Sequence, residues 1–496
     1  MKDKTLSTPG GAQLLYDVDD RPPLQQTIPF AIQHVFAMFG ATILVPVLVN
    51  TIVGYEAIPI PVAIFMSGVG TIIYQICTKR KSPVYLGSSF AFISPIALAC
   101  QTAGVAGAMT GLAVVGLIYV IFALIVFATG KGWIDKLLPP VVIGPMIMII
   151  GLGLASSAIS QIGLDNIDVD WRHLVVALVT LATAVIFMVF VKGFFNVIPF
   201  LMAIVFGYLS SIVLGLVDFT AVKEASWIAV PRFQIMFYHY APSLAAVWQI
   251  APVALVTMAE HIGDHEALST ITGRDLLKNP GLAFTLLGDG LATLVAALFG
   301  GPANTTYGEN TAVVGMTRNA SVYVLRWAAI LAIAMSFMGK LTALISAIPG
   351  PVLGGVSLLL YGFIALNGAK VWVKNRTNFG CPRNIVITAI MLCLGLGGAV
   401  FAIPLGKAVV SFSGMSFAAI AGIALNQLLP QDKNELAEKR QQALDDRRLE
   451  VLHSHPELLA QVDVVGDVAK LSEKLDAATN VVDLSRLAET LKSIAE

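Results

Sequence analysis

Apolar runs of about 20 residues recur along most of this chain, separated by polar, glycine-rich and proline-rich segments. Such a run spans a bilayer as a helix, because backbone groups in lipid have to be hydrogen-bonded within the element itself. The pattern predicts an all-α, multi-pass membrane protein with fourteen spans. They are expected at residues 29–49, 57–77, 83–99, 105–129, 134–158, 173–191, 195–217, 245–266, 280–300, 303–318, 320–347, 351–373, 384–403 and 409–429.

Basic residues recur after every second predicted span. The segment 79–81 (Lys-Arg-Lys) follows the second span, Lys192 follows the sixth and Arg274 follows the eighth. The loop 159–172, on the opposite side, holds three aspartates against one arginine. Because cytoplasmic loops carry the excess of Lys and Arg, both termini are predicted to lie in the cytoplasm. Residues 1–28 are then a polar cytoplasmic N-terminus.

The composition also favours a membrane protein. Of the 496 residues, 56% are hydrophobic and 12% are charged, whereas about 25% are charged in ordinary soluble domains. The net charge of zero gives no support for nucleic-acid binding. The four cysteines form no CxxC pair, which favours a packing role over metal binding or disulfide formation.

The C-terminal segment 431–496 differs from the rest of the chain. It is rich in charged residues, with Leu and Val at helical spacing. This pattern predicts cytoplasmic amphipathic helices. A solvated tail is the simpler interpretation, and a regulatory or oligomer-contact role is the alternative.

Two stretches indicate an internal repeat. The sequence Pro-Val-Val-Ile-Gly at 140–144 resembles Pro-Val-Leu-Gly-Gly at 351–355, and each opens a long span. Two short, interrupted spans, 83–99 and 303–318, occupy matching places. Two halves of seven spans follow, and the second half is inverted because seven is odd. Inverted repeats with broken helices are typical of transporters that bind their substrate at the bilayer midplane.

The interrupted spans have a chemistry of their own. Residues 85–92 and 304–308 each begin as an extended or flexible segment and then become helical. A half-helix that begins inside the membrane presents free N–H groups and a positive dipole end, which bind carbonyl oxygens or an anion. The rings of Phe90 and Tyr307 are suited to stacking on a flat ligand. Ordinary packing is the alternative for both rings.

Four of the acidic residues within predicted spans stand out. A charged side chain at the bilayer centre costs at least about 2.5–3.5 kcal/mol, so an intramembrane acid indicates a functional site. Glu260 and Asp264 are four residues apart and share one helix face. Glu309 opens the second half-helix. Asp289 is the fourth acid, and a helix-packing hydrogen bond to neighbouring backbone is its alternative role.

Histidines near these acids give weak evidence for a metal. His261 and His265 have HxxxH spacing but lack the HExxH order, and no third ligand is evident nearby. Contacts between helices are the better interpretation for both. His34, on the first span, is predicted to be a hydrogen-bonded structural residue. No metal and no cofactor are therefore expected.

Several stretches match a known family in order along the chain: 33–42, 85–95, 302–310 and 356–362. With them, the chain resembles the nucleobase–ascorbate transporter family, and within it the bacterial uracil:proton symporters. The resemblance runs from Arg21 to about Leu428. The family signature is formed here by Glu309, Asn310, Thr317 and Arg318. An acid at its head resembles the uracil branch, whereas Gln is typical of the purine branch.

The resemblance implies a fold of two inverted repeats of seven spans, with two half-helix spans that contain short extended segments. A substrate-holding core domain would comprise 29–129 and 245–347, which are spans 1–4 and 8–11. A gate domain would comprise 130–217 and 348–430, which are spans 5–7 and 12–14. A homodimer through the gate domain is also implied.

The resemblance assigns roles by position. Glu260 and Glu309 would accept hydrogen bonds from the two ring N–H groups of uracil, since carboxylates are acceptors. Backbone N–H groups at Phe90 and Gly308 would hold the ring carbonyls. The residues expected to line the pocket are Tyr307, Tyr361 and Ala41.

Three positions depart from the uracil branch. Asp264 stands where a histidine implicated in proton coupling is expected, and Asp289 stands where Asn is expected. Ala312 replaces the usual Gly of the signature. Proton coupling through Glu260, Asp264, Glu309 and Asp289 is the prediction, but a xanthine or uric acid permease stays open.

The expected function is proton-coupled uracil import across the cytoplasmic membrane by alternating access. Protonation of the acid cluster would favour substrate binding from outside, and movement of the core domain would expose the site to the cytoplasm. Uracil or a related nucleobase, protons, the lipid bilayer and a second copy of the chain are the expected partners. An anion exchanger of the same architecture is less favoured because the predicted pocket is acidic, and an intramembrane enzyme has only the HxxxH spacing in its support.

Overall fold

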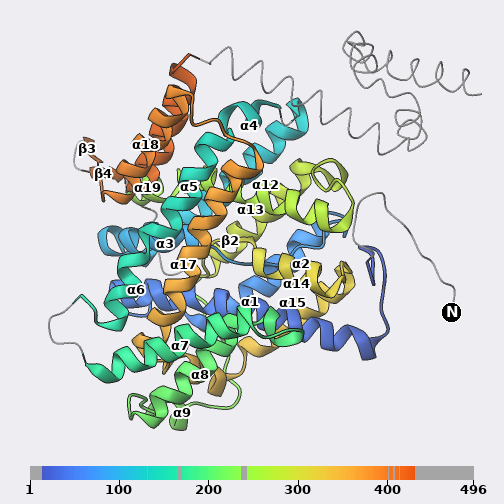
Figure 1. Cartoon of the computed structure of the whole chain (residues 1–496), viewed down its shortest axis with the longest axis vertical. Helices are drawn as coiled ribbons and strands as arrows, with labels where there is room; N and C mark the ends of the chain where they lie inside the picture. Colours follow the sequence, from blue (N-terminus) through green and yellow to red (C-terminus); the bar gives the residue numbers. More distant parts are fainter. Residues whose placement is uncertain are drawn as a thin grey trace, which may run out of the picture. The chain divides into compact units, whose positions relative to one another are not determined.

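The computed structural model describes residues 14–130, 132–165, 170–235, 243–399, 401–405, 408–412 and 414–430, which are predominantly helical (Figure 1). In this part of the chain, seven helices are long and apolar enough to cross a membrane, judged by length and composition. Helical content and apolar length agree with the predicted class. The predicted amphipathic tail, 431–496, lies outside the described residues.

The first half of the chain contains long helices and one short strand. Its elements are α1 (Leu24–Val53), α2 (Ile60–Cys77), β1 (Leu86–Ser88), η1 (Phe90–Phe92), α3 (Ile93–Thr129), α4 (Gly132–Leu137), α5 (Pro140–Gly153), α6 (Ala155–Ile162), α7 (Trp171–Val189), η2 (Phe194–Val197), α8 (Pro199–Val213) and α9 (Thr220–Glu224).

The second half is similar but ends in a hairpin and a short helix. Its elements are α11 (Leu244–Ile250), α12 (Val253–Thr272), η3 (Leu277–Gly281), α13 (Leu282–Leu298), β2 (Asn304–Thr306), α14 (Gly308–Thr317), α15 (Val322–Ser336), α16 (Gly339–Ser346), α17 (Gly350–Lys374), α18 (Pro382–Leu396), β3 (Phe401–Leu405), β4 (Ala408–Phe412) and α19 (Gly414–Leu428).

Two span boundaries have clear local causes. The predicted spans 83–99 and 105–129 meet in α3 at Gly104, whose φ of 69° and ψ of −178° interrupt the helix. Only glycine adopts such a conformation without strain. The predicted span 245–266 is broken between α11 and α12 at Ala251–Pro252, and proline at 252 lacks the N–H that a continuous helix needs.

The last two predicted spans are wrong at their facing ends. The apolar runs 384–403 and 409–429 were expected to be helical throughout, but α18 ends at Leu396 and the chain forms a hairpin. β3 and β4 pair antiparallel, with Phe401 opposite Phe412 and Leu405 opposite Ala408. Glycines at 395, 397 and 398 disfavour helix, and Ile403, Val409 and Val410 favour strand. Hydrophobicity alone does not separate these two conformations.

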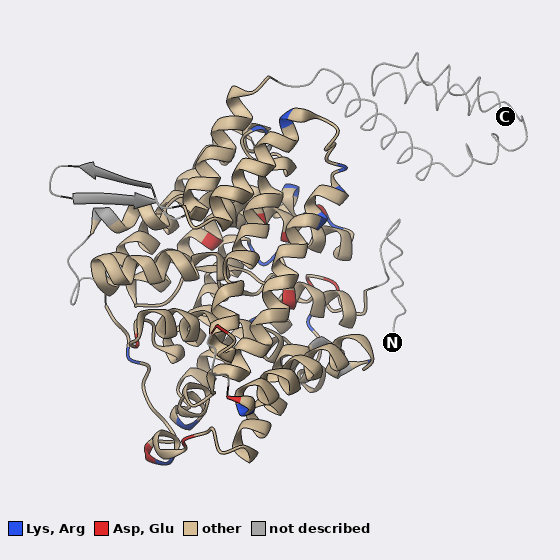
Figure 2. Ribbon diagram, turned by 60° about the vertical axis from the view of Figure 1, so that its left-hand side comes forward, with Lys and Arg blue, Asp and Glu red and all other residues tan. Residues whose placement is uncertain are grey.

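The helices pack as two groups. α13 packs against α2 and α3, and α15 packs against α1 and α2. α17 packs against α5, α6, α7 and α8, while α18 packs against α19 and α5. Figure 2 shows long stretches of helix without acidic or basic residues, with a few acidic positions among them.

The two broken spans meet through their strands. β1 and β2 pair antiparallel, with Leu86 opposite Thr306, Gly87 opposite Thr305 and Ser88 opposite Asn304. Each strand is followed by a helical segment, η1 and α3 after β1 and α14 after β2. The predicted extended segments are therefore confirmed in both places. Pairing satisfies backbone groups that would otherwise be costly at this depth.

Gly87 is expected to tolerate no side chain. A Cβ built there would lie 2.3 Å from the ring of Tyr307, which is held by hydrogen bonds and cannot swing away freely. Overpacking of this kind costs about 1–3 kcal/mol, so Gly87→Ala should lower the thermal unfolding midpoint of the detergent-purified protein. Gly153→Ala is the matched control, since a Cβ there meets nothing within 4 Å. Equal midpoints for the two variants would contradict the expected clash.

Candidate functional site

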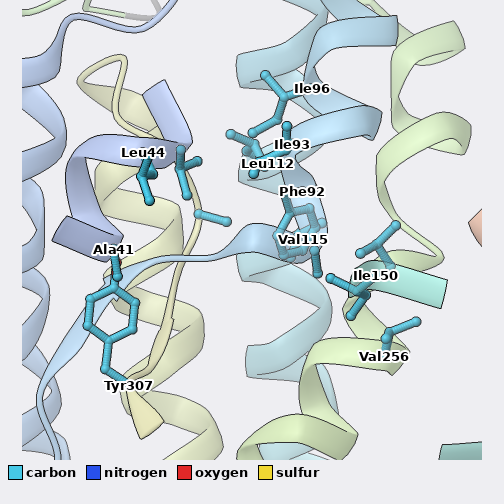
Figure 3. Packing of buried hydrophobic residues seen from close by; sticks show 14 of the residues in the cluster. Ala41, Leu44, Phe92, Ile93, Ile96, Leu112, Val115, Ile150, Val256 and Tyr307 are labelled. Atoms are coloured by element: carbon cyan, nitrogen blue, oxygen red, sulfur yellow. The ribbon is translucent and has the colours of Figure 1, made fainter. Parts of the chain in front are cut away.

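Tyr307 links the β1–β2 pair to α1 through hydrogen bonds. Its amide donates to the carbonyl of Tyr85 at 3.1 Å, its hydroxyl donates to the carbonyl of Ser88 at 3.1 Å, and the same hydroxyl lies 3.0 Å from Thr42 Oγ1. Figure 3 shows the Tyr307 ring beneath Ala41 of α1. The residue is 3% exposed, so its ring serves packing, and a stacking role remains a prediction.

The half-helix α14 begins directly after this tyrosine. Tyr307 is its N-cap and makes no side-chain cap hydrogen bond, so first-turn N–H groups stay available. Gly308 is exposed and Glu309, in the first turn, is half-buried. The dipole of a helix favours an acidic side chain or an anion at this end.

A cavity of about 220 Å³ opens beside Glu309. Its lining residues come from α14, α1, the end of α7 and the segment that leads into α8: Phe36, Ala37, Gly40, Met188, Asn196, Ile198, Pro199, Phe200, Leu201, Glu309, Ala312 and Met316. The lining is apolar apart from Glu309 and Asn196. Phe90, Glu260 and Tyr361 are not among its lining residues.

The acids of α12 lie next to the start of α14. Asp264 accepts a hydrogen bond of 2.5 Å from Thr306 Oγ1 of β2 through one oxygen. Its other oxygen would lie 3.9 Å from a Cβ built on Gly308. Asp264, Glu309 and Asp289 all lie close enough to Glu260 to act on it electrostatically. The structure therefore places Asp264 and Glu309 at the beginning of α14, with Glu260 one turn before Asp264 on α12.

Asp289 is paired with His261 in the protein interior. Asp289 Oδ2 lies 2.8 Å from His261 Nδ1, and both side chains are fully buried. The alternative proposed from sequence, a hydrogen bond to neighbouring backbone, is not what is observed for Oδ2. Asp289 Oδ1 and His261 Nε2 find no hydrogen-bond partner among the described residues.

His265 is used in a separate set of contacts. Its Nδ1 donates to the carbonyl of His261 at 2.7 Å, which leaves Nε2 to accept from the hydroxyl of Tyr74 at 2.6 Å. Ser82 lies 3.0 Å from the same hydroxyl. The described residues contain no group of three or more His, Cys, Asp or Glu side chains placed to hold a metal ion.

The signature residues secure both ends of α14. Asn310 Nδ2 donates to the carbonyl of His34 at 3.0 Å and lies 3.2 Å from its Nδ1, which joins α14 to α1. The hydrogen bonding predicted for His34 is observed, and its structural role stays a prediction. Thr317 Oγ1 donates to the carbonyl of Val313 at 2.7 Å. The carbonyl of Arg318, which has φ of 53°, accepts the amide of Leu15 at 2.7 Å.

Phe90 and Tyr361 lie in different surroundings. Phe90 is half-buried in η1, directly after Ser88 and Ser89, whose hydroxyls are buried without a hydrogen-bond partner in the described part of the chain. Tyr361 is 1% exposed on α17, where its backbone packs closely against Gly151 of α5. The structure does not bring Tyr361 to the cavity at Glu309.

Sequence reasoning missed three polar residues at this site. Thr306 holds Asp264, and Ser88 and Ser89 carry unpaired hydroxyls beside the crossing strands. Ser and Thr are common in membrane helices and strands as packing residues, so their type alone gave no signal. The unusual run of polar residues in two otherwise apolar spans, at 88–89 and 304–306, was the available clue.

Comparison with known proteins places this arrangement in a family. The family model described as "Permease family" (Xan_ur_permease) matches residues 25–404. The chain belongs to this family. It is 45% identical over 432 residues to the uracil permease of Bacillus subtilis (strain 168), covering 86% of this chain and 97% of that protein. It is 40% identical to the uracil permease of Escherichia coli (strain K12), covering 82% of this chain and 92% of that protein.

Solved structures support the fold. The transmembrane domain of the cyanobacterial bicarbonate transporter BicA matches with a TM-score of 0.55 at 13% identity, covering 83% of this chain and all of that chain. At this identity the likeness concerns architecture only. Together with the apolar helices, the family places the chain among multi-pass membrane permeases, which are transporters.

Proposed function

We propose that this chain imports uracil together with protons across the cytoplasmic membrane by alternating access. The observation that carries the proposal is that Asp264 of α12, one turn after Glu260, lies against the start of α14, whose first turn holds Glu309. Carboxylates accept hydrogen bonds and helix-start N–H groups donate them. Uracil offers the complement, with ring N–H donors and carbonyl acceptors. The uracil permeases among its relatives support the same substrate.

In this proposal Glu260 and Glu309 bind the ring N–H groups. The N–H groups of Phe90 and Gly308 bind the carbonyls, and Tyr307, Tyr361 and Ala41 shape the pocket. Tyr361 reaches the ligand after the two helix groups move relative to each other, since it does not line the cavity at Glu309. Protons enter the cluster formed by Glu260, Asp264, Glu309 and Asp289.

The two groups of packed helices support division into core and gate. α1, α2, α3, α12, α13, α14 and α15 would form the core, and α5–α8 with α17–α19 would form the gate. Fourteen spans in two inverted sevens, cytoplasmic termini, an inner-membrane location and a homodimer through the gate remain parts of this proposal. The cavity between α14 and α8 would then be a path from Glu309 to the cytoplasm.

A purine permease is the second candidate. Asp264 and Asp289 are the observations that favour it, because both depart from the uracil branch. An anion exchanger is a remote candidate, suggested by the likeness in architecture to a bicarbonate transporter. Four acids at the site disfavour an anionic substrate, because like charges repel in a low-dielectric setting.

Radiolabelled uracil uptake in cells that lack their own permease tests the proposal. Uptake should be competed by unlabelled uracil, and not by xanthine or uric acid, and a protonophore should abolish it. Thymine competition reports how tightly the C5 position is enclosed. Competition by xanthine or uric acid without uracil uptake would support the purine candidate. If neither a protonophore nor an imposed pH gradient changes the rate of uracil uptake, transport is not coupled to protons.

A further inference from the structure

A second cavity lies away from the acid cluster. It has a volume of about 480 Å³ and is lined by Asp19, Lys81, Arg274, Asp275, Lys278 and Asn279. Its basic residues come from three places: the loop after α2, the end of α12 and the turn η3 before α13. All three places belong to loops that positive-inside reasoning puts in the cytoplasm.

Two of its cations have no counter-ion. Lys81 donates to Asn279 Oδ1 at 3.2 Å, and neither Lys81 nor Lys278 has a carboxylate within ion-pair distance among the described residues. One carboxylate oxygen of Asp275, Oδ1, accepts a hydrogen bond from the backbone amide of Lys278 at 3.1 Å. The acids of this cavity therefore do not neutralise its lysines.

Arg274 is held by acids from the N-terminal segment 14–20. Its guanidinium lies 2.6 Å from Asp17 and 3.0 Å from Asp19. The side chain of Asp19 is 70% exposed, and exposed ion pairs are worth little because water and salt screen them. An anion with more oxygens than a carboxylate can replace Asp19 and bind Arg274, Lys81 and Lys278 together.

We propose that this cavity binds a small organic phosphate from the cytoplasm, with its phosphate on Lys81, Arg274 and Lys278 in place of Asp19. A phosphate group presents three oxygens to such donors and makes charge-assisted hydrogen bonds with them. A bare phosphate would leave most of the volume empty, since ligand pockets of about 300–1,000 Å³ hold whole organic molecules. Asn279 and the free oxygen of Asp275 are placed for hydroxyl or N–H groups of the organic part.

The cavity is connected to the proposed transport site through α12 and α14. Arg274 follows Gly273 at the end of α12, the helix that carries Glu260 and Asp264. The segment that Arg274 holds is also bonded to the end of α14, through the amide of Leu15 and the carbonyl of Arg318. Displacing Asp19 would leave Asp17 as the ion pair that joins this segment to Arg274. The site rests on the cytoplasmic orientation in the proposed function, but not on uracil as the substrate.

Binding to the purified full chain in phosphatidylcholine nanodiscs tests the site without any transport assay. Uridine 5′-monophosphate and inorganic phosphate should bind, and uridine should not. The double variant Lys81→Gln/Lys278→Gln should weaken uridine 5′-monophosphate binding at least about tenfold, because each lysine contributes a charge-assisted hydrogen bond. Asp19→Asn should tighten it. Lys370→Gln is the matched control, since exposed Lys370 donates to Asn367 as Lys81 does to Asn279.

Three outcomes would overturn the proposal. One is that neither uridine 5′-monophosphate nor inorganic phosphate binds to the wild type. Another is binding that the double variant retains. The last is retention of phosphatidylglycerol by the wild type but not by the double variant, with no uridine 5′-monophosphate bound in phosphatidylcholine nanodiscs. That result would assign the same basic residues to a lipid headgroup.

Discussion

Replacing Glu309 by glutamine is expected to lower uracil uptake at least about 30-fold. The carboxylate stands in the first turn of α14, beside the free N–H groups and the cavity. A hydrogen bond to a charged group contributes about 1.5–3 kcal/mol, and about 1.4 kcal/mol corresponds to a factor of ten. An amide also offers an N–H group where the ligand presents its own N–H. Loss of a proton acceptor would reduce coupled uptake further.

Uptake of radiolabelled uracil, normalised to the amount of protein in the membrane, measures this effect. Glu309→Asp should retain part of the activity, because the carboxylate is kept while its reach is shortened. Lys340→Gln is a control far from the cluster, since Lys340 donates to the carbonyls of Val222 and Lys223. If Glu309→Gln takes up uracil as fast as the wild type, Glu309 is not part of the binding site.

Replacing His261 by leucine is expected to destabilise the protein by about 1–3 kcal/mol. Asp289 Oδ2 would lose its partner at 2.8 Å, and its Oδ1 already has none among the described residues. Leaving one partner of a buried hydrogen bond without the other costs about this much, because a desolvated polar group remains in the interior. The thermal unfolding midpoint of the detergent-purified protein should fall well below that of the wild type.

The double variant His261→Leu/Asp289→Leu separates this cause from a simple packing defect. Removing both partners should recover much of the loss, since replacing a buried pair by apolar residues is often neutral. His173→Leu is the matched control at the start of α7, where no carboxylate forms an ion pair with it in the described residues. If the double variant unfolds at a lower temperature than His261→Leu, loss of the pairing is not the source of the destabilisation.

Local patterns were enough for the elements whose causes are local. The long apolar runs predicted helices such as α1, α2 and α17, and the polar, glycine-containing segments at 85–92 and 304–308 predicted short extended stretches. The same reasoning failed at 401–412, where an apolar run forms the hairpin of β3 and β4. Apolar length predicts burial in lipid, but both a helix and a paired strand satisfy the backbone.

The candidate site divides in a similar way. Intramembrane acids stand out from sequence because their cost demands a purpose, so Glu260, Asp264, Asp289 and Glu309 were found without a structure. Their partners were not found. Thr306, which bonds Asp264, lies on β2, about forty residues away from α12 along the chain. His261, which pairs with Asp289, lies on a different helix from that acid.

Short sequence patterns were sufficient to predict the membrane class, the broken spans and the acids, because hydrophobic length, helix-breaking residues and charge in lipid are properties of short segments. Which groups meet became evident from the packing of the helices and strands. That packing pairs β1 with β2 across more than two hundred residues, buries His261 with Asp289 and places Arg274 against Asp17 and Asp19. Such contacts depend on how helices pack in three dimensions, and side-chain type and spacing along one segment do not encode that packing.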